Sequence, residues 1–154
     1  MSDHVAINRD SWNGMAEDWV TAGEHAWSSA PTWGNWQAPE ADLGLLPDNM
    51  DGMCAIELGC GTGYVSAWMA RRGAQVTAID VSPAQLETAR RLAAKHGADT
   101  AFIEGNAEAT GLPDAAVDFA ISEYGAAIWC PPDVWLREAW RLLRPGGRLV
   151  FLGN

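Results

Sequence analysis

The sequence predicts an α/β fold built on a doubly wound, mainly parallel sheet with helices on both faces. From residue 54 onward, short apolar runs alternate with segments of helical periodicity, the pattern of parallel strands joined by helices. The runs are short and strongly apolar, as expected of strands that are buried on both sides of a sheet. A chain of 154 residues has the length of one ordinary domain with one core.

The elements follow from local signals. A helix is expected over residues 10–20, where Asp10 can cap the start and Trp12, Met15 and Trp19 recur at helical spacing. Residues 28–39 predict an irregular loop, because serine, proline and glycine interrupt any periodicity. Later strands are expected at 54–58, 75–79, 101–103, 117–122 and 148–152, with helices at 64–72, between Ser82 and Gly97, and from Pro132, and a turn at 145–147. We divide the chain into a Trp-rich helical or lid segment, 1–50, and a core, 51–154.

Composition argues against several functions. Twenty acidic and ten basic residues give a net charge of −10, which repels phosphate backbones and argues against nucleic-acid binding. No apolar run is long enough to span a membrane, and no secretory signal is visible at the start. The three cysteines form no C-x-x-C pair and the histidines are scattered, so neither a zinc site nor a disulfide framework is expected. A reducing cytoplasm fits best.

A glycine-rich turn follows the first predicted strand of the core. Gly59, Gly61 and Gly63 stand at alternate positions, which allows a tight turn close to a ligand without side-chain obstruction. A strand-to-helix turn alone would use the same residues. Tyr64 occupies the place of the third glycine of a dinucleotide fingerprint. A carboxylate at Glu57, just before the turn, suits a cationic ligand better than a pyrophosphate.

Asp80 ends the second predicted strand of the core. It follows Gly63 at close to the spacing at which an acid accepts hydrogen bonds from ribose hydroxyls. Its alternative role is to cap the next helix, but Ser82 already fills that position, with Pro83 and Gln85 completing a capping arrangement. We therefore interpret Asp80 as a ribose ligand.

Five motifs in order over residues 54–152 resemble the class I S-adenosylmethionine-dependent methyltransferases. They are Glu57–Gly63, Asp80, Gly105-Asn106-Ala107-Glu108, residues 112–120 and residues 143–149. The resemblance implies a Rossmann-like sheet with strand order 3-2-1-4-5. Family members usually add a helix and two strands after the fifth strand, so a C-terminally truncated core is expected. Its exposed fifth-strand edge would favour self-association.

The resemblance also implies the cofactor, S-adenosyl-L-methionine, and a role for each motif. The turn containing Gly59, Cys60, Gly61 and Gly63 would pass under the methionine part, which Glu57 would orient. Asp80 would hold the ribose. The adenine would contact Val81, Asn106 and Ala107. An amide carbonyl at Asn106, in place of the commoner aspartate, can still accept from an amino group.

Five further residues are candidates for contact with the cofactor or the acceptor. Glu123, just beyond the fourth strand, would lie near the sulfonium and could act as a general base if the acceptor carries a proton. A solvated acid at the end of the strand is an equal alternative for Glu123. Tyr124, the next residue, would likewise either face the acceptor pocket or lie in solvent. Trp19 stands where relatives place a tyrosine over the cofactor, although the buried face of an amphipathic helix explains it as well. Trp33 and Trp36 would belong to a lid.

The function expected from these residues is methyl transfer to a small-molecule acceptor. The cofactor would bring the reactive group, and the protein would supply binding and orientation. Two alternatives remain at this point. One is a non-catalytic S-adenosylmethionine-binding module or inactive fragment. The other is a nicotinamide-dependent enzyme on a similar fold.

Overall fold

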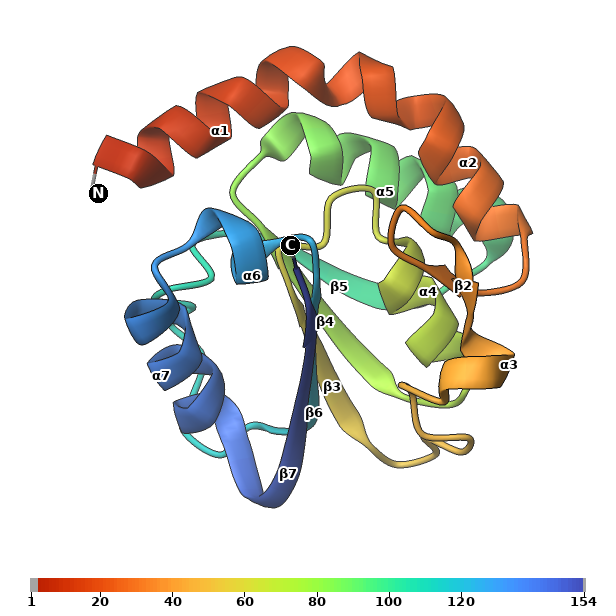
Figure 1. Ribbon diagram of the computed structural model, residues 1–154, viewed down its shortest axis with the longest axis vertical. Coiled ribbons are helices and arrows are strands. Elements are labelled where there is room, and N and C mark those ends of the chain that lie inside the picture. The colour runs from red at the N-terminus through yellow and green to blue at the C-terminus, as the bar shows by residue number, and fades with distance from the viewer. Residues whose placement is uncertain (1–2, 154) are drawn as a thin grey trace.

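The computed structural model, which describes residues 3–153, contains a five-stranded parallel sheet (Figure 1). Its strands are β3 (Cys54–Leu58), β4 (Gln75–Asp80), β5 (Thr100–Glu104), β6 (Val117–Glu123) and β7 (Leu143–Leu152). Their order across the sheet is β5-β4-β3-β6-β7. Numbered along the chain within this sheet, that order is 3-2-1-4-5, so the predicted topology is confirmed.

Helices cover both faces of the sheet, as predicted. On one face lie α4 (Tyr64–Arg71) and α5 (Pro83–His96); on the other lie α6 (Ala126–Trp129) and α7 (Pro132–Leu142) (Figure 1). Alternate residues of a strand point to opposite faces. Ala55 accordingly packs with Trp68 of α4, whereas the next residue, Ile56, packs with Trp135 of α7. The sheet is thus buried on both sides.

The N-terminal segment forms a longer helical arm than residues 10–20. It consists of α1 (Asp3–Met15), the 3₁₀ turn η1 (Ala16–Trp19) and α2 (Val20–Ser28), and it arches over α5 (Figure 1). Val5 and Trp27 anchor its two ends in the interior. These anchors lie outside the short periodic stretch, which explains why sequence periodicity underestimated the helix. Met15 and Trp19 are exposed, so the expected buried face of this helix is wrong.

The predicted loop contains a small hairpin, β1 (Thr32–Trp33) paired with β2 (Ala38–Pro39), followed by α3 (Glu40–Leu43). Trp33 is buried in the same cluster as Met50 and strand residues of the large sheet. The indole N–H of Trp33 donates to Glu40 Oε2 at 2.7 Å. The two sequence segments, 1–50 and 51–154, therefore share one core.

Strand β7 begins earlier than expected. Val117 pairs with Leu143 and Phe119 with Arg148, so residues 144–147 bulge out opposite Asp118 alone. The expected turn is therefore an irregularity within the strand. β7 lies at the sheet edge, where Phe151 is half-exposed and packs edge-on against Trp135. Self-association through this edge stays a prediction.

Helices α3 and α6 were not predicted, because four residues are too few to show a period. Among the helices of residues 3–153, none is long and apolar enough to cross a bilayer.

Candidate active site

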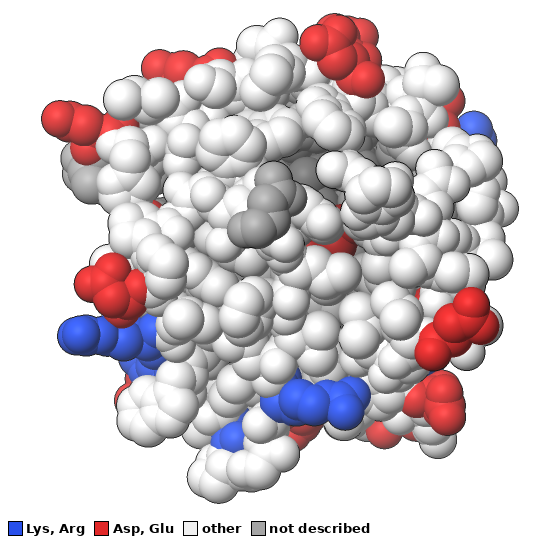
Figure 2. Space-filling model, in the orientation of Figure 1, with Lys and Arg blue, Asp and Glu red and all other residues white. Residues whose placement is uncertain are grey.

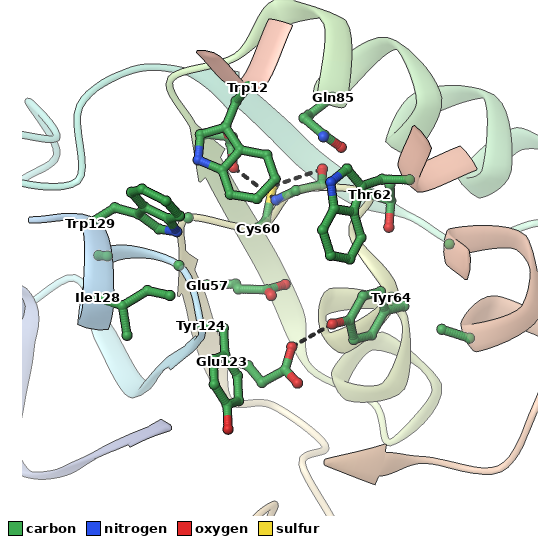
Figure 3. Close-up of a pocket in the computed structure, with 18 of the residues that line it drawn as sticks. Trp12, Glu57, Cys60, Thr62, Tyr64, Gln85, Glu123, Tyr124, Ile128 and Trp129 are labelled. Atoms are coloured by element: carbon green, nitrogen blue, oxygen red, sulfur yellow. Dashed lines mark hydrogen bonds between the residues drawn. The ribbon is translucent and has the colours of Figure 1, made fainter. Parts of the chain in front are cut away.

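A cavity of about 680 Å³ opens where β3, β4 and β6 end (Figure 3). Ligands of open α/β sheets bind in this place, beyond the carboxyl ends of the strands. The volume is in the range of small-molecule sites. Residues of the helical arm, the hairpin, the glycine-rich turn and α6 complete its walls. The sheet thus supplies the floor, and the N-terminal segment supplies part of the cover.

The glycines of the turn after β3 have different tasks. A Cβ on Gly59 would lie 2.7 Å from the backbone nitrogen of Ala126, so this glycine lets two turns touch. A Cβ on Gly61 would meet no protein atom within 4 Å, although φ is +52°, and Gly61 lines the cavity. Gly63, with φ +81°, starts α4. Gly61 is therefore the position that leaves room for a ligand.

Cys60, between these glycines, is buried and also lines the cavity. Burial raises the pKa of its thiol well above the ordinary value, and the charges of Asp80 and Glu57 add to this. The neutral thiol is unreactive. Cys60 therefore acts as a small apolar wall residue, and only its backbone is suited to a ligand.

Glu57 is buried beside the turn. Its Oε2 accepts the backbone N–H of Ser66 at 2.9 Å and the Ser66 hydroxyl at 2.5 Å. Burial raises the pKa of Glu57 well above its ordinary value, and the nearby charges of Glu123 and Asp80 raise it further. The carboxylate points into the cavity (Figure 3). No hydrogen bond reaches Oε1 from residues 3–153, so this oxygen is available to a cation.

Asp80 fixes the glycine-rich turn from the neighbouring strand. Its Oδ2 accepts the backbone N–H of Gly61 at 2.8 Å, and its Oδ1 accepts that of Ser82 at 2.9 Å. Burial raises the pKa of Asp80. Each carboxylate oxygen retains a second acceptor site. Ser82 caps α5 through its hydroxyl, which accepts the N–H of Gln85, as expected.

The motif after β5 forms another wall. Val81, Asn106 and Ala107 line the cavity, and their contact with the adenine stays a prediction. The side-chain carbonyl oxygen of Asn106 accepts the backbone N–H of Glu108 at 2.9 Å, so this side chain already stabilises the turn in which it lies. Glu108 Oε1 lies 2.5 Å from Nε2 of His4 in α1. Sequence analysis missed this contact, which ties the helical arm to the predicted adenine wall.

Glu123 is not a solvated strand-end acid. Its Oε1 accepts the backbone N–H of Gly34 at 3.2 Å, and its Oε2 accepts the hydroxyl of Tyr64 (Figure 3). Burial raises the pKa of Glu123. Tyr124, the next residue, lines the cavity in a left-handed conformation with φ +51°. Glu123 thus joins β6, α4 and the hairpin at the cavity wall.

Three indoles form an aromatic rim on the cavity: Trp12, Trp19 and Trp129. Trp12 lies 5.8 Å from Trp19 and 5.4 Å from Trp129 between ring centroids. Trp19 also lines the cavity, and its contact with the cofactor stays a prediction. Sequence analysis missed Trp12 as a wall residue and did not consider Trp129. The position of Trp129 soon after a strand's carboxyl end was the available signal.

The structure corrects the roles of Trp33 and Trp36. Trp33 is only 2% exposed, within the core, while Trp36 is 93% exposed at the hairpin tip. Neither side chain lines the cavity. The hairpin instead contributes Gly34, Asn35 and Gln37 to the wall. Position in an aperiodic loop could not distinguish a side chain that faces a ligand from one that anchors the loop.

Comparison with known proteins identifies the family. A family model described as a methyltransferase domain matches residues 56–151, more than half of the chain. Solved structures with the same fold include proteins described as S-adenosylmethionine-dependent methyltransferases. The chain belongs to the class I S-adenosylmethionine-dependent methyltransferases, so the predicted family and its cofactor are confirmed.

Three similar proteins show the range of this family. The malonyl-[acyl-carrier protein] O-methyltransferase of Serratia marcescens is 39% identical over 62% of this chain and 36% of its own length. An S-adenosylmethionine-dependent methyltransferase structure from Mesorhizobium loti is 28% identical, with a TM-score of 0.62, over 72% of this chain and 50% of the other. The [4+2]-cyclase SpnF is 27% identical, with a TM-score of 0.72, over 93% of this chain and 58% of the other. The chain thus spans about a third to three fifths of the length of these relatives.

Proposed function

We propose that this chain binds S-adenosylmethionine in the cavity and directs its methyl group to a small-molecule acceptor. The observation that carries the proposal is the junction of Asp80 and Gly61 across two neighbouring strand ends, 2.8 Å apart. It places an acidic hydrogen-bond acceptor beside a backbone turn that has free space above it. The available oxygen of Glu57 adds a partner for a cation in the same cavity.

The residues present fit the cofactor. The methionine part would lie over Gly61, with its ammonium group near Glu57. The ribose hydroxyls would donate to Asp80, whose oxygens each have an acceptor site left. The adenine would lie against Val81 and Ala107. The side chains of this wall are held by the protein itself, which lowers the entropy cost of binding.

The cofactor, when bound, supplies an electrophilic methyl group on a sulfonium. The chain's own contribution is to hold donor and acceptor in line, which can provide much of the rate gain. The aromatic rim and the hairpin would limit the access of water. Glu123 would take a proton from a hydroxyl acceptor, and burial, which raises its pKa, makes its carboxylate a stronger base. To do so it would exchange the hydroxyl of Tyr64 for that of the acceptor.

A second candidate function is cofactor binding without methyl transfer. SpnF, which aligns with 93% of this chain, is named as a cyclase. The fold is therefore compatible with chemistry other than methyl transfer. The nicotinamide alternative is disfavoured by the family match over residues 56–151.

The two candidates differ in turnover. Calorimetry with S-adenosylmethionine tests binding, and mass spectrometry of S-adenosylhomocysteine formed with a library of small acceptors tests transfer. Binding with acceptor-dependent turnover supports the methyltransferase. Binding without turnover, across the library and a malonyl-carrier protein, supports the second candidate. Absence of binding by folded protein contradicts both.

A further inference from the structure

The acidic side chains that line the cavity have no lysine or arginine beside them. Within residues 3–153 these acids are Glu57, Asp80, Glu108 and Glu123. The described lining contains neither lysine nor arginine, and His25 is its one basic side chain. In Figure 2 red atoms are visible within the central hollow, and blue atoms lie away from it. The cavity therefore offers a bound molecule no permanent cation.

The arginines of the core are engaged elsewhere. Arg72 pairs with Glu40 at 3.4 Å, and Arg144 pairs with Asp118 at 2.9 Å. Both pairs lie outside the cavity lining. An acceptor with a carboxylate or phosphate would therefore lose its hydration beside four acids and find no lysine or arginine of the protein as a counter-charge, which is unfavourable.

A cationic acceptor is disfavoured for a different reason. Each of the four carboxylates already has a protein partner: Ser66, Gly61 with Ser82, His4, and Tyr64 with Gly34. The available oxygen of Glu57 is the partner expected for the donor's own ammonium. The sulfonium of the donor would also repel a second cation nearby.

The remaining wall is apolar and aromatic. Trp12 and Trp129 meet edge to face, with an interplanar angle of 87°, and Trp19 continues the aromatic rim. Ile128 lines the cavity beside Trp129 (Figure 3). Trp19 and Trp129 are 47% and 42% exposed, so they retain apolar area that a ligand can cover. Indole faces favour stacking with a planar ring.

We propose that the acceptor is an uncharged molecule with an apolar ring system, which stacks on the aromatic rim of Trp12, Trp19 and Trp129. The inference rests on the proposed function and specifies its substrate class. The acidic lining would exclude anionic acceptors from the cavity, and stacking on the aromatic rim would provide the affinity for an uncharged ring. These two contributions can be tested separately.

The test compares three compounds that share a naphthalene ring and differ in charge. Neutral naphthol, anionic naphthoate and cationic naphthylmethylammonium are each titrated at neutral pH into protein saturated with S-adenosylhomocysteine. Naphthol should bind most tightly, and naphthoate should bind at least about tenfold more weakly. Equal or tighter binding of naphthoate would overturn the inference. Failure of S-adenosylhomocysteine itself to bind would instead contradict the proposed function, so the two failures are distinguishable.

Matched variants separate the rim from the charge. Trp129→Ala should weaken naphthol binding severalfold, whereas Trp140→Ala, which removes a 78% exposed indole outside the cavity, should leave it unchanged. If the two substitutions changed the affinity for naphthol equally, the proposed stacking on the aromatic rim would be wrong. Glu123→Gln and Glu108→Gln should each narrow the ratio of naphthol to naphthoate affinity. A ratio that stays constant in both folded variants would overturn the electrostatic basis of the exclusion.

Discussion

The carboxylate of Glu123 accepts the backbone N–H of Gly34 at 3.2 Å, although 89 residues separate them in the sequence. Gly34 adopts φ +63°, and a Cβ there would lie 3.0 Å from the hydroxyl of Tyr124. The contact therefore depends on a glycine in the hairpin and an acid at the end of β6. It fastens the hairpin to the cavity wall.

Substitution Glu123→Gln should loosen the hairpin while the fold persists. An amide keeps an oxygen for the N–H of Gly34 and an N–H for the oxygen of Tyr64, but it carries no charge, so both hydrogen bonds should weaken. The cost should be about 1 kcal/mol, because a neutral acceptor replaces a charged one. Hydrogen exchange of the Gly34 amide measures the effect. Tyr64→Phe is the control, since it leaves the Gly34 contact in place. Equal protection of the Gly34 amide from exchange in wild type and Glu123→Gln would show that Glu123 does not hold the hairpin.

Substitution Asp80→Ala should weaken S-adenosylmethionine binding by about tenfold or more, because hydrogen bonds to a charged acceptor are lost. The same change frees the N–H groups of Gly61 and Ser82, so some stability should be lost as well. Calorimetry measures the affinity, and thermal unfolding measures the stability. Glu24→Gln, on the exposed side of α2, is the control. Unchanged affinity in Asp80→Ala would remove Asp80 from the site.

Alanine substitutions at two glycines of the same turn should have different effects on stability and on cofactor affinity. Gly59→Ala places a methyl group 2.7 Å from the Ala126 nitrogen, so unfolding should become easier by more than about 2 kcal/mol. Gly61→Ala meets no protein atom and should cost only about 1 kcal/mol of backbone strain at φ +52°. Cofactor affinity should nevertheless fall in Gly61→Ala. Normal cofactor binding by that variant would place the ligand elsewhere.

Cofactor binding should change tryptophan fluorescence through the aromatic rim rather than through the hairpin tip. Trp19 lines the cavity, whereas Trp36 is exposed outside it. The change on adding S-adenosylhomocysteine should persist in Trp36→Phe and decrease in Trp19→Phe. The reverse pattern would show that the hairpin tip closes over the ligand, as the sequence alone had predicted.

The stability of the unliganded protein should fall as pH rises above 4.5, the ordinary pKa of a glutamate. Burial raises the pKa of Glu57, so the folded state holds a proton that the unfolded state, with a pKa near 4.5, has released. Stability decreases with pH wherever the folded state binds more protons. Denaturant unfolding at several pH values should show this slope, and Glu57→Gln should flatten it. An identical slope in the variant would exclude Glu57 as a source.

The strands and the glycine-rich turn could be predicted because their signals are local, whereas the strand order and the cofactor came from the resemblance to the family. Apolar runs mark strands, glycines mark the turn after β3, and Ser82 with Pro83 marks the start of α5. Asp80 follows from its position at a strand end. None of these inferences required knowledge of which distant residues meet.

The acceptor side could not be predicted in the same way, because it depends on long-range contacts. Glu40, which holds Trp33, Leu45 and Leu46, shows no periodicity or motif that distinguishes it from other acids. The meeting of Trp12 and Trp129 depends on how the helical arm crosses the sheet. Composition reveals the abundance of tryptophan, but the packing decides which indoles reach the cavity.

The most direct test of the account is a calorimetric titration of folded wild-type protein with S-adenosylmethionine, repeated on Asp80→Ala. We expect saturable binding of one cofactor per chain to the wild-type protein, weakened about tenfold or more in the variant. Absence of binding by folded wild-type protein, or equal affinity in the two proteins, would contradict it.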